Sequence, residues 1–196
     1  LDKTKEQLPI AYVDRAEAIF TCCGNEMWRD DDLIYDNKFK LTKKLNKLLG
    51  TILSNSIYPH RYGNHIEDRG SMVNFSIVGR DCTQEQRDEY FKYDNEKGER
   101  KIIANAIKEK FPDLDAVIGG QISIDIYPKG NDKSQILDII EQERLVPPSE
   151  YIFIGDGIEN GGNDYPLAEL MDNTEICDWY HTKGWEHTMQ ILEKLN

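Results

Sequence analysis

The feature that most constrains the fold is an apolar run closed by a glycine and an aspartate, within residues 151–164, which read YIFIGDGIENGGND. Tyr151–Ile154 has the length and composition of a strand buried on both faces, as in a parallel sheet covered by helices. Gly155 permits a tight turn, so Asp156 emerges at the carboxyl end of this strand. Ligands bind at that edge in open α/β sheets. The stretch therefore predicts an α/β fold with a polar loop at its ligand-binding edge.

The loop that follows this strand offers oxygen ligands. Asp156, Asn163 and Asp164 lie within nine residues of one another. Carboxylate and amide oxygens suit a hard cation such as Mg²⁺. The simpler alternative is a loop in which Asp and Asn side chains cap the next helix. Both interpretations are open on this stretch alone.

Composition excludes several classes of protein. The chain has 196 residues, of which 39% are hydrophobic and 31% charged, as expected of a folded domain, and its net charge is −12. That charge argues against a general binder of nucleic acids or anionic membranes, which need clustered Lys and Arg. No apolar stretch has membrane-spanning length and no signal peptide is visible, so we expect a cytoplasmic protein. The four cysteines fit no zinc spacing.

Hydrophobic patterning divides the chain into segments. The first and last parts have an α/β pattern, and the middle has the pattern of an antiparallel sheet with helices. Strands are predicted at 18–21, 25–28, 33–35, 73–78, 116–119, 121–127 and 151–154. Helices are predicted at about 39–53, from the capping box at Thr83 onward, and at 100–110, 132–142 and 185–195.

The segment GGQISIDIYPKGNDKS, residues 119–134, contains the most informative strand. Isoleucines alternate there with Gln121, Ser123 and Asp125, so one face is apolar and the other presents an amide, a hydroxyl and a carboxylate. A solvated outer face is the simpler interpretation. Solvated faces usually favour longer or β-branched polar residues, because Asp is a poor strand former. A row of short polar groups is instead suited to hydrogen bonding with sugar hydroxyls.

The same segment ends at an expected helix start. Asp132 is a suitable N-cap, whereas Lys133 would oppose the helix dipole in the first turn. An anion bound at that terminus would remove the conflict, because helix N-termini bind phosphate readily. A surface lysine that tolerates the small cost is the alternative.

Three segments together resemble a known family: RGSMVNFSIVGRDCTQEQR (69–87), IGGQISIDIYPKGNDK (118–133) and IGDGIENGGND (154–164). In order and spacing they resemble the eukaryotic-type phosphomannomutases of the haloacid dehalogenase superfamily. The resemblance implies an α/β fold with a haloacid-dehalogenase-like (Rossmann-like) core and an α/β cap that contains an antiparallel sheet. The core is then expected at 1–36 and 128–196, N-terminally incomplete, and the cap at 37–127.

The resemblance also implies roles for residues of the cap. Arg69, Arg80 and Arg87 match the arginines that hold the distal phosphate of the substrate, for which planar guanidinium groups are suited. Ser123 and Asp125 match residues that contact the sugar. The substrate expected from the family is a phosphorylated hexose, interconverted between mannose 6-phosphate and mannose 1-phosphate on the route to GDP-mannose.

On the core side, Lys133 matches the lysine that neutralises the transferring phosphoryl group. Asp156, with Asn163 and Asp164 beside it, matches the acidic motif that helps to hold Mg²⁺. The family further implies a hexose 1,6-bisphosphate activator and a homodimer through the cap. Neither a nucleic acid nor a membrane is an expected partner.

The chain departs from the family at the nucleophile. Family members carry Asp-x-Asp-Gly-Thr after their first strand, and no segment here fits. Asp113 and Asp115 have the spacing but follow a helix, and Asp30 and Asp32 lie in an acidic turn. We therefore expect residues 1–196 alone to be inactive. A sugar-phosphate phosphatase of the same superfamily and a non-catalytic remnant that binds phosphosugars or a partner are the alternatives.

Overall fold

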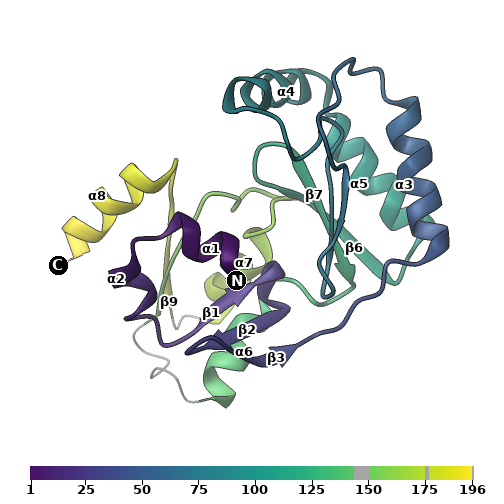
Figure 1. Ribbon diagram of the computed structural model, residues 1–196. Coiled ribbons are helices and arrows are strands. Elements are labelled where there is room, and N and C mark those ends of the chain that lie inside the picture. Colours follow the sequence, from purple (N-terminus) through teal and green to yellow (C-terminus); the bar gives the residue numbers. More distant parts are fainter. Residues whose placement is uncertain (144–150, 175–176, 196) are drawn as a thin grey trace.

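The computed structural model describes residues 1–143, 151–174 and 177–195, and these form three separate β-sheets (Figure 1). The strands are β1 (Ile19–Thr21), β2 (Glu26–Arg29), β3 (Asp32–Asp36), β4 (Ile66–Asp68), β5 (Val73–Phe75), β6 (Leu114–Gly119), β7 (Ser123–Pro128), β8 (Tyr151–Gly155) and β9 (Cys177–His181). The helices are α1 (Asp2–Gln7), α2 (Ile10–Val13), the short 3₁₀ turn η1 (Cys22–Gly24), α3 (Lys43–Asn55), α4 (Gln84–Lys97), α5 (Glu99–Lys110), α6 (Gln135–Gln142), α7 (Tyr165–Thr174) and α8 (Trp185–Leu195).

The largest sheet is antiparallel, with strand order β4-β5-β7-β6. Its apolar face, which includes Phe75, Ile124 and Ile126, packs against buried residues of α3, α4 and α5. The expected hairpin is present, because β6 and β7 pair antiparallel around Gly120, whose φ of 52° favours glycine. The expected antiparallel sheet with helices in the middle of the chain is thus confirmed.

The opposite face of this sheet carries an ordered polar row. Pairing places Glu67 of β4 opposite Asn74 of β5, and Asn74 opposite Asp125 of β7. Ser123 lies on the same face of β7, two residues before Asp125. Ser123 and Asp125 are only 4% and 7% exposed, so the simpler interpretation of a solvated outer face is wrong. Gln121 lies outside the strand.

The remaining sheets are smaller. Strands β1, β2 and β3 form an antiparallel meander, and β8 pairs in parallel with β9. The expectation that Tyr151–Ile154 is buried on both faces is wrong, since Ile152 is 50% exposed and β9 is the single partner of β8 among the described strands. With a single strand neighbour, β8 lacks the double-sided cover of a wide parallel sheet.

Several predicted boundaries move for local reasons. Helix α3 begins at Lys43 rather than 39, because the Thr42 side chain accepts a hydrogen bond from the backbone N–H of Leu45 and caps it. Strand β5 ends at Phe75, where Ser76 turns the chain by accepting a hydrogen bond from the N–H of Gly79. The capping box of α4, formed by Thr83 and Gln86, is confirmed.

The start of α6 also differs from the prediction. Asp132 is not the N-cap, because the helix starts at Gln135 with Ser134 as its N-cap; the Asp132 carboxylate accepts hydrogen bonds from the N–H and the hydroxyl of Ser134. Lys133 therefore precedes the first turn, and the predicted conflict with the helix dipole does not arise. In the described part of the chain, no helix is long and apolar enough to cross a membrane.

Candidate phosphosugar site

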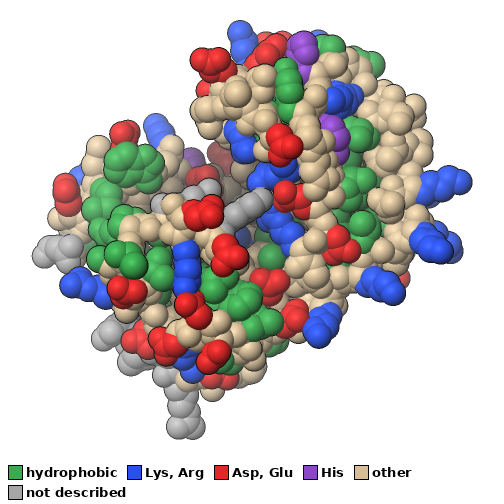
Figure 2. Space-filling view, in the orientation of Figure 1, with side chains coloured by type: hydrophobic (Ala, Val, Ile, Leu, Met, Phe, Trp, Pro, Cys, Tyr) green, Lys and Arg blue, Asp and Glu red, His purple; other side chains and the backbone are tan. Residues whose placement is uncertain are grey.

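A cleft of about 930 Å³ lies between the polar face of the large sheet and the rest of the molecule. Its walls come from α1, the β1–η1 segment, the region around β4, Asp125 of β7, and the two loop residues Lys133 and Asn163. Figure 2 shows acidic and basic side chains gathered in the hollow between the two lobes. The cleft thus brings together polar groups from segments far apart in the sequence.

The three predicted arginines form one cluster, of which Arg69 lines this cleft at the end of β4. Arg69 Nη2 donates to Glu67 Oε2 at 2.7 Å, and Arg80 Nε lies 3.6 Å from the same oxygen. Arg80 Nη1 also donates to Ser123 Oγ at 2.9 Å, and Arg87 Nη2 donates to the backbone carbonyl of Arg80 at 3.4 Å. Glu67 thus joins Arg69 and Arg80, and Arg87 contacts the backbone of Arg80. The role of the three arginines as phosphate ligands stays a prediction.

Burial and neighbouring charges shift the pKa values of Arg80 and Arg69 in opposite directions. Burial, together with the charges of Arg69 and Arg87, lowers the pKa of Arg80, although Glu67 opposes the shift. For Arg69, burial acts to lower the pKa, but the hydrogen bond and the charge of Glu67 outweigh it and raise the pKa. Arg80 Nε is buried without a hydrogen-bond acceptor. An incoming phosphate oxygen would supply the missing acceptor and offset the like-charge repulsion.

Beside the arginines, a buried hydrogen-bond network holds Asp125. Asn74 Nδ2 donates to Asp125 Oδ1 at 2.7 Å, and the Cys23 thiol donates to Asp125 Oδ2 at 3.7 Å. Burial and the charge of Asp125 raise the pKa of the Cys23 thiol well above its usual value, so that it remains a donor. Asn74 Oδ1 has no hydrogen-bond partner. Asp125 is thereby fixed in the cleft, with an acceptor of Asn74 beside it.

Lys133 and Asp164 form an ion pair at the far side of the cleft. Asp164 is 2% exposed, and its Oδ2 also accepts the backbone N–H groups of Asp156 and Gly157 at 3.1 and 2.9 Å. Burial acts to raise the pKa of Asp164, but Lys133 and these N–H groups outweigh it and lower the pKa. For Lys133, burial acts to lower the pKa, but Asp164 outweighs it and raises the pKa. The pair is charged and locks the loop around Lys133.

The predicted magnesium ligands fit a cation only in part. Both oxygens of Asp164 are engaged, Asp156 is exposed, and Asn163 lines the cleft. The described residues contain no group of three His, Cys, Asp or Glu side chains that could hold a metal ion. One carboxylate and one amide suit Mg²⁺ only when substrate phosphate oxygens complete the shell.

The two Asp-x-Asp pairs lie elsewhere. Asp30 and Asp32 flank the turn between β2 and β3, where Asp31 pairs with Lys5. Asp115 Oδ2 accepts the N–H of Gly130 at 3.3 Å from the β6 edge of the large sheet. None of these four carboxylates is among the described residues that line the cleft. Neither pair is therefore positioned as a nucleophile here.

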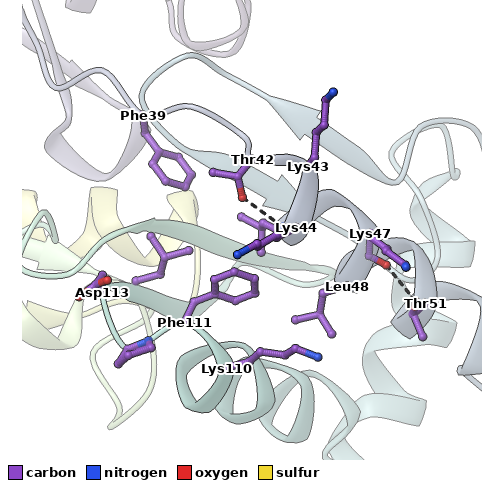
Figure 3. Close-up of a pocket in the computed structure, with 13 residues that line it drawn as sticks. Phe39, Thr42, Lys43, Lys44, Lys47, Leu48, Thr51, Lys110, Phe111 and Asp113 are labelled. Atoms are coloured by element: carbon purple, nitrogen blue, oxygen red, sulfur yellow. Dashed lines mark hydrogen bonds between the residues drawn. The ribbon is translucent and has the colours of Figure 1, made fainter.

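A second cleft, of about 950 Å³, lies between the start of α3 and the end of α5. Figure 3 shows its lysines around an apolar floor; the labelled lining residues include Phe39, Lys43, Lys44, Lys47, Leu48, Lys110 and Phe111. Among the described residues of its lining, Asp113 is the one carboxylate and there is no arginine. It lacks the mixed polar groups that a phosphosugar needs, and we assign no phosphosugar to it.

Sequence reasoning missed Glu67 and Asn74, which stand in the same cross-strand row as Asp125. A signal existed for Asn74, because polar Asn74 and Ser76 alternate with apolar residues between 73 and 78. For Glu67 there was none, since a single acid in a three-residue strand does not reveal its neighbours across the sheet.

The fold and this cleft define a class: an α/β protein whose antiparallel sheet presents short polar groups, with arginines beside them, opposite a loop lysine. In comparisons with known proteins, residues 1–195 match the family described as eukaryotic phosphomannomutase. The chain belongs to that family, and the membership expected from the three motifs is confirmed.

Relatives give the same result. Phosphomannomutase of Dendrobium officinale is 35% identical over 177 residues, covering 86% of this chain and 68% of the relative. Phosphomannomutase 2 of Dictyostelium discoideum is 32% identical over 203 residues, covering 97% and 78%. Among solved structures, the IMP-bound mutant D172N of the Plasmodium falciparum IMP-nucleotidase superposes with a TM-score of 0.50 at 15% identity, covering 91% of this chain and 48% of that one, which supports the fold alone. The expected mixed α/β fold class is confirmed.

Proposed function

We propose that the cleft binds a phosphorylated hexose and serves phosphoryl transfer of the phosphomannomutase type, which interconverts mannose 6-phosphate and mannose 1-phosphate. The observation that carries the proposal is the opposition of two groups across one cleft. On one side Arg69 and buried Asp125 line the cleft, with Arg80 and Ser123 hydrogen-bonded to each other next to them, and on the other is the ion-paired Lys133. One end can hold a phosphate, the middle a sugar and the other end a second phosphate.

Each residue has a task in this proposal. Arg69, Arg80 and Arg87 hold the distal phosphate, because forked guanidinium donors match its oxygens. Asp125, fixed by Asn74, accepts from sugar hydroxyls. Lys133 offsets charge on the transferring phosphoryl group, and such positioned charges act strongly where water is excluded.

The metal and the activator belong to the same proposal. Asp156 and Asn163 would hold Mg²⁺ together with substrate oxygens, and Asp164 would contribute by fixing their loop. When bound, Mg²⁺ would supply further neutralisation of phosphoryl charge. We infer that a hexose 1,6-bisphosphate serves as activator, since each of its phosphates finds cationic groups at one end of the cleft.

Within the described residues, a binding function without turnover has its own support, because no Asp-x-Asp pair lines the cleft. The test is calorimetry with mannose 1-phosphate, together with a coupled-enzyme assay that contains a hexose bisphosphate and Mg²⁺. We expect residues 1–196 to bind mannose 1-phosphate weakly and to show neither mutase nor phosphatase turnover. Turnover that disappears in Asp113→Asn or Asp30→Asn would contradict the placement of those pairs outside the site.

The arginine assignment is tested by Arg80→Ala. We expect a loss of phosphosugar affinity of roughly 1.5–3 kcal/mol, the scale of a charge-assisted hydrogen bond. Lys92→Ala, which removes an exposed cation from α4, is the matched control and should leave affinity unchanged. Unchanged affinity in Arg80→Ala would remove this arginine from the site.

We further propose that residues 37–127 form a cap and that residues 1–36 and 128–196 form the core, in a cytoplasmic protein with neither nucleic-acid nor membrane partners.

A homodimer through the cap is supported by exposed Ile57 and Ile102, which flank a groove of about 500 Å³. Light scattering after chromatography should give a dimer for the wild type and a monomer for Ile102→Lys. A wild-type monomer would contradict the proposal.

A further inference from the structure

Glu67 is an unexpected component of a phosphate-binding cluster. Its carboxylate forms ion pairs with Arg69 and Arg80, two of the three cations that the proposed function assigns to a phosphate, and in the described part of the chain no other carboxylate lies within 4.0 Å of these guanidinium groups. Its side chain is 17% exposed and lines the cleft. Glu67 therefore already forms ion pairs with Arg69 and Arg80, the guanidinium groups to which an incoming anion would bind.

We propose that Glu67 is a built-in competitor of the distal phosphate, whose carboxylate binds Arg69 and thereby lowers the affinity of the arginine cluster for phosphate. The inference rests on the proposed function and deepens it, because it assigns the residue that sets how tightly the phosphate is held. Three guanidinium groups and one carboxylate approach charge balance with a phosphate monoester, which carries about −1.5 to −2 near pH 7.

The alternative is that Glu67 chiefly orients the arginines, in which case its loss would weaken phosphate binding. The contacts oppose that alternative. Arg80 has a hydrogen bond to Ser123 besides its 3.6 Å ion pair with Glu67, and Arg87 is held by the backbone carbonyl of Arg80. The guanidinium of Arg69 donates a hydrogen bond of 2.7 Å to Glu67, whereas the Arg80 Nε lies 3.6 Å away. The dominant effect of Glu67 on a bound anion is therefore its charge.

A competing carboxylate would make release of a bound phosphate easier. A cluster of three uncompensated arginines would hold a dianion tightly and release it slowly, since opposing charges at contact distance attract strongly in a partly buried site. A carboxylate that takes back Arg69 as the phosphate leaves lowers the cost of release. Steps of ligand release limit turnover in many enzymes.

The test compares wild type with Glu67→Gln, which keeps the size and removes the charge, by calorimetry at low salt. The probes are methyl phosphate, a dianion at pH 8, and dimethyl phosphate, a monoanion. We expect Glu67→Gln to bind methyl phosphate about tenfold more tightly, a difference of about 1.4 kcal/mol. The gain for dimethyl phosphate should be smaller, because the repulsion removed scales with ligand charge.

Controls separate this inference from a fold effect and from failure of the proposed function. Glu109→Gln removes an exposed carboxylate of α5 and should change neither affinity, and Glu67→Asp, which keeps the charge, should not tighten binding. Weaker or unchanged methyl phosphate binding in Glu67→Gln overturns the inference, while wild-type binding of mannose 1-phosphate leaves the proposed function standing. If neither the wild type nor Glu67→Gln binds a phosphate dianion, both the inference on Glu67 and the proposed function are overturned.

Discussion

Residues 37–127 and the rest of the chain differ in how completely they bury their apolar surface. The first region places sixteen buried residues in one continuous cluster around a four-stranded sheet. Outside it the sheets have three and two strands, and most of the large exposed apolar side chains lie there, among them Ile10, Ile152 and Trp185. Two or three strands with one partly covered face contribute little stability by themselves.

Charge separates the same two regions. The whole chain has 24 Lys and Arg and 36 Asp and Glu; residues 37–127 hold fifteen and thirteen of these, which leaves nine and 23 for the rest. The acidity thus belongs almost wholly to the less buried region. Self-repulsion there opposes a compact state, whereas the near-neutral region keeps its cationic arginines for the cleft.

The largest effect expected from this difference concerns stability. Phe75→Ala empties a fully buried site in the continuous cluster and should lower the free energy of unfolding by about 3–5 kcal/mol. Ile152→Ala, at a half-exposed strand position, should change it by less than about 0.5 kcal/mol. Urea unfolding followed by circular dichroism measures both. Equal losses would mean that the two regions share one core.

Asp164→Ala tests the stability of the region outside residues 37–127. It leaves the cation of Lys133 unpaired and two backbone N–H groups without their acceptor, so we expect a loss of about 3 kcal/mol. The loss should be local. Hydrogen exchange should accelerate in β8 and α7 while amides of β5 and β7 keep their protection. Uniform acceleration would show that the regions unfold together.

A smaller effect is expected at the start of α4. Thr83→Ala removes the capping box and should lower the free energy of unfolding by about 1 kcal/mol. Thr83→Asn, which can still accept the hydrogen bond, serves as the matched control in thermal unfolding. A loss as large in Thr83→Asn would mean that the hydroxyl acts through something other than capping.

The smallest effect concerns a link between the regions. Ser71 donates to Glu26 Oε1 at 2.6 Å, which joins the meander to the large sheet. Burial acts to raise the pKa of Glu26, but hydrogen bonds from Ser71, Thr21 and Trp28 outweigh it and lower the pKa below the usual 4.5. The stability that Glu26 contributes is therefore present above about pH 4.5 and is lost as the pH falls through the lowered pKa.

Glu26→Gln should flatten the pH dependence of the melting temperature below about pH 5. The corresponding change in the free energy of unfolding should be smaller than the change that Thr83→Ala causes. Glu17→Gln, which removes an exposed carboxylate of the same region, should leave the acid limb unchanged. An identical acid limb in wild type and Glu26→Gln would exclude this link as a source of acid sensitivity.

Local patterns determined much of this protein. Alternating isoleucines set the face of β7, the capping box set the start of α4, and three ordered motifs sufficed to indicate the family. These features depend on neighbours in sequence, where side-chain period and hydrogen bonding to the nearby backbone act directly. The sequence alone thus identified the polar face that carries Ser123 and Asp125.

Only the tertiary structure decided the electrostatics of the cleft. The pairing of Lys133 with Asp164 bridges 31 residues of sequence, and the hydrogen bond from Asn74 to Asp125 bridges 51. No periodicity encodes such contacts, because they depend on strand register and on how the sheets approach one another. The same is true of Glu67, whose place opposite Asn74 is set by the β4–β5 register and whose carboxylate lies 3.6 Å from Arg80 Nε, beyond the end of β5.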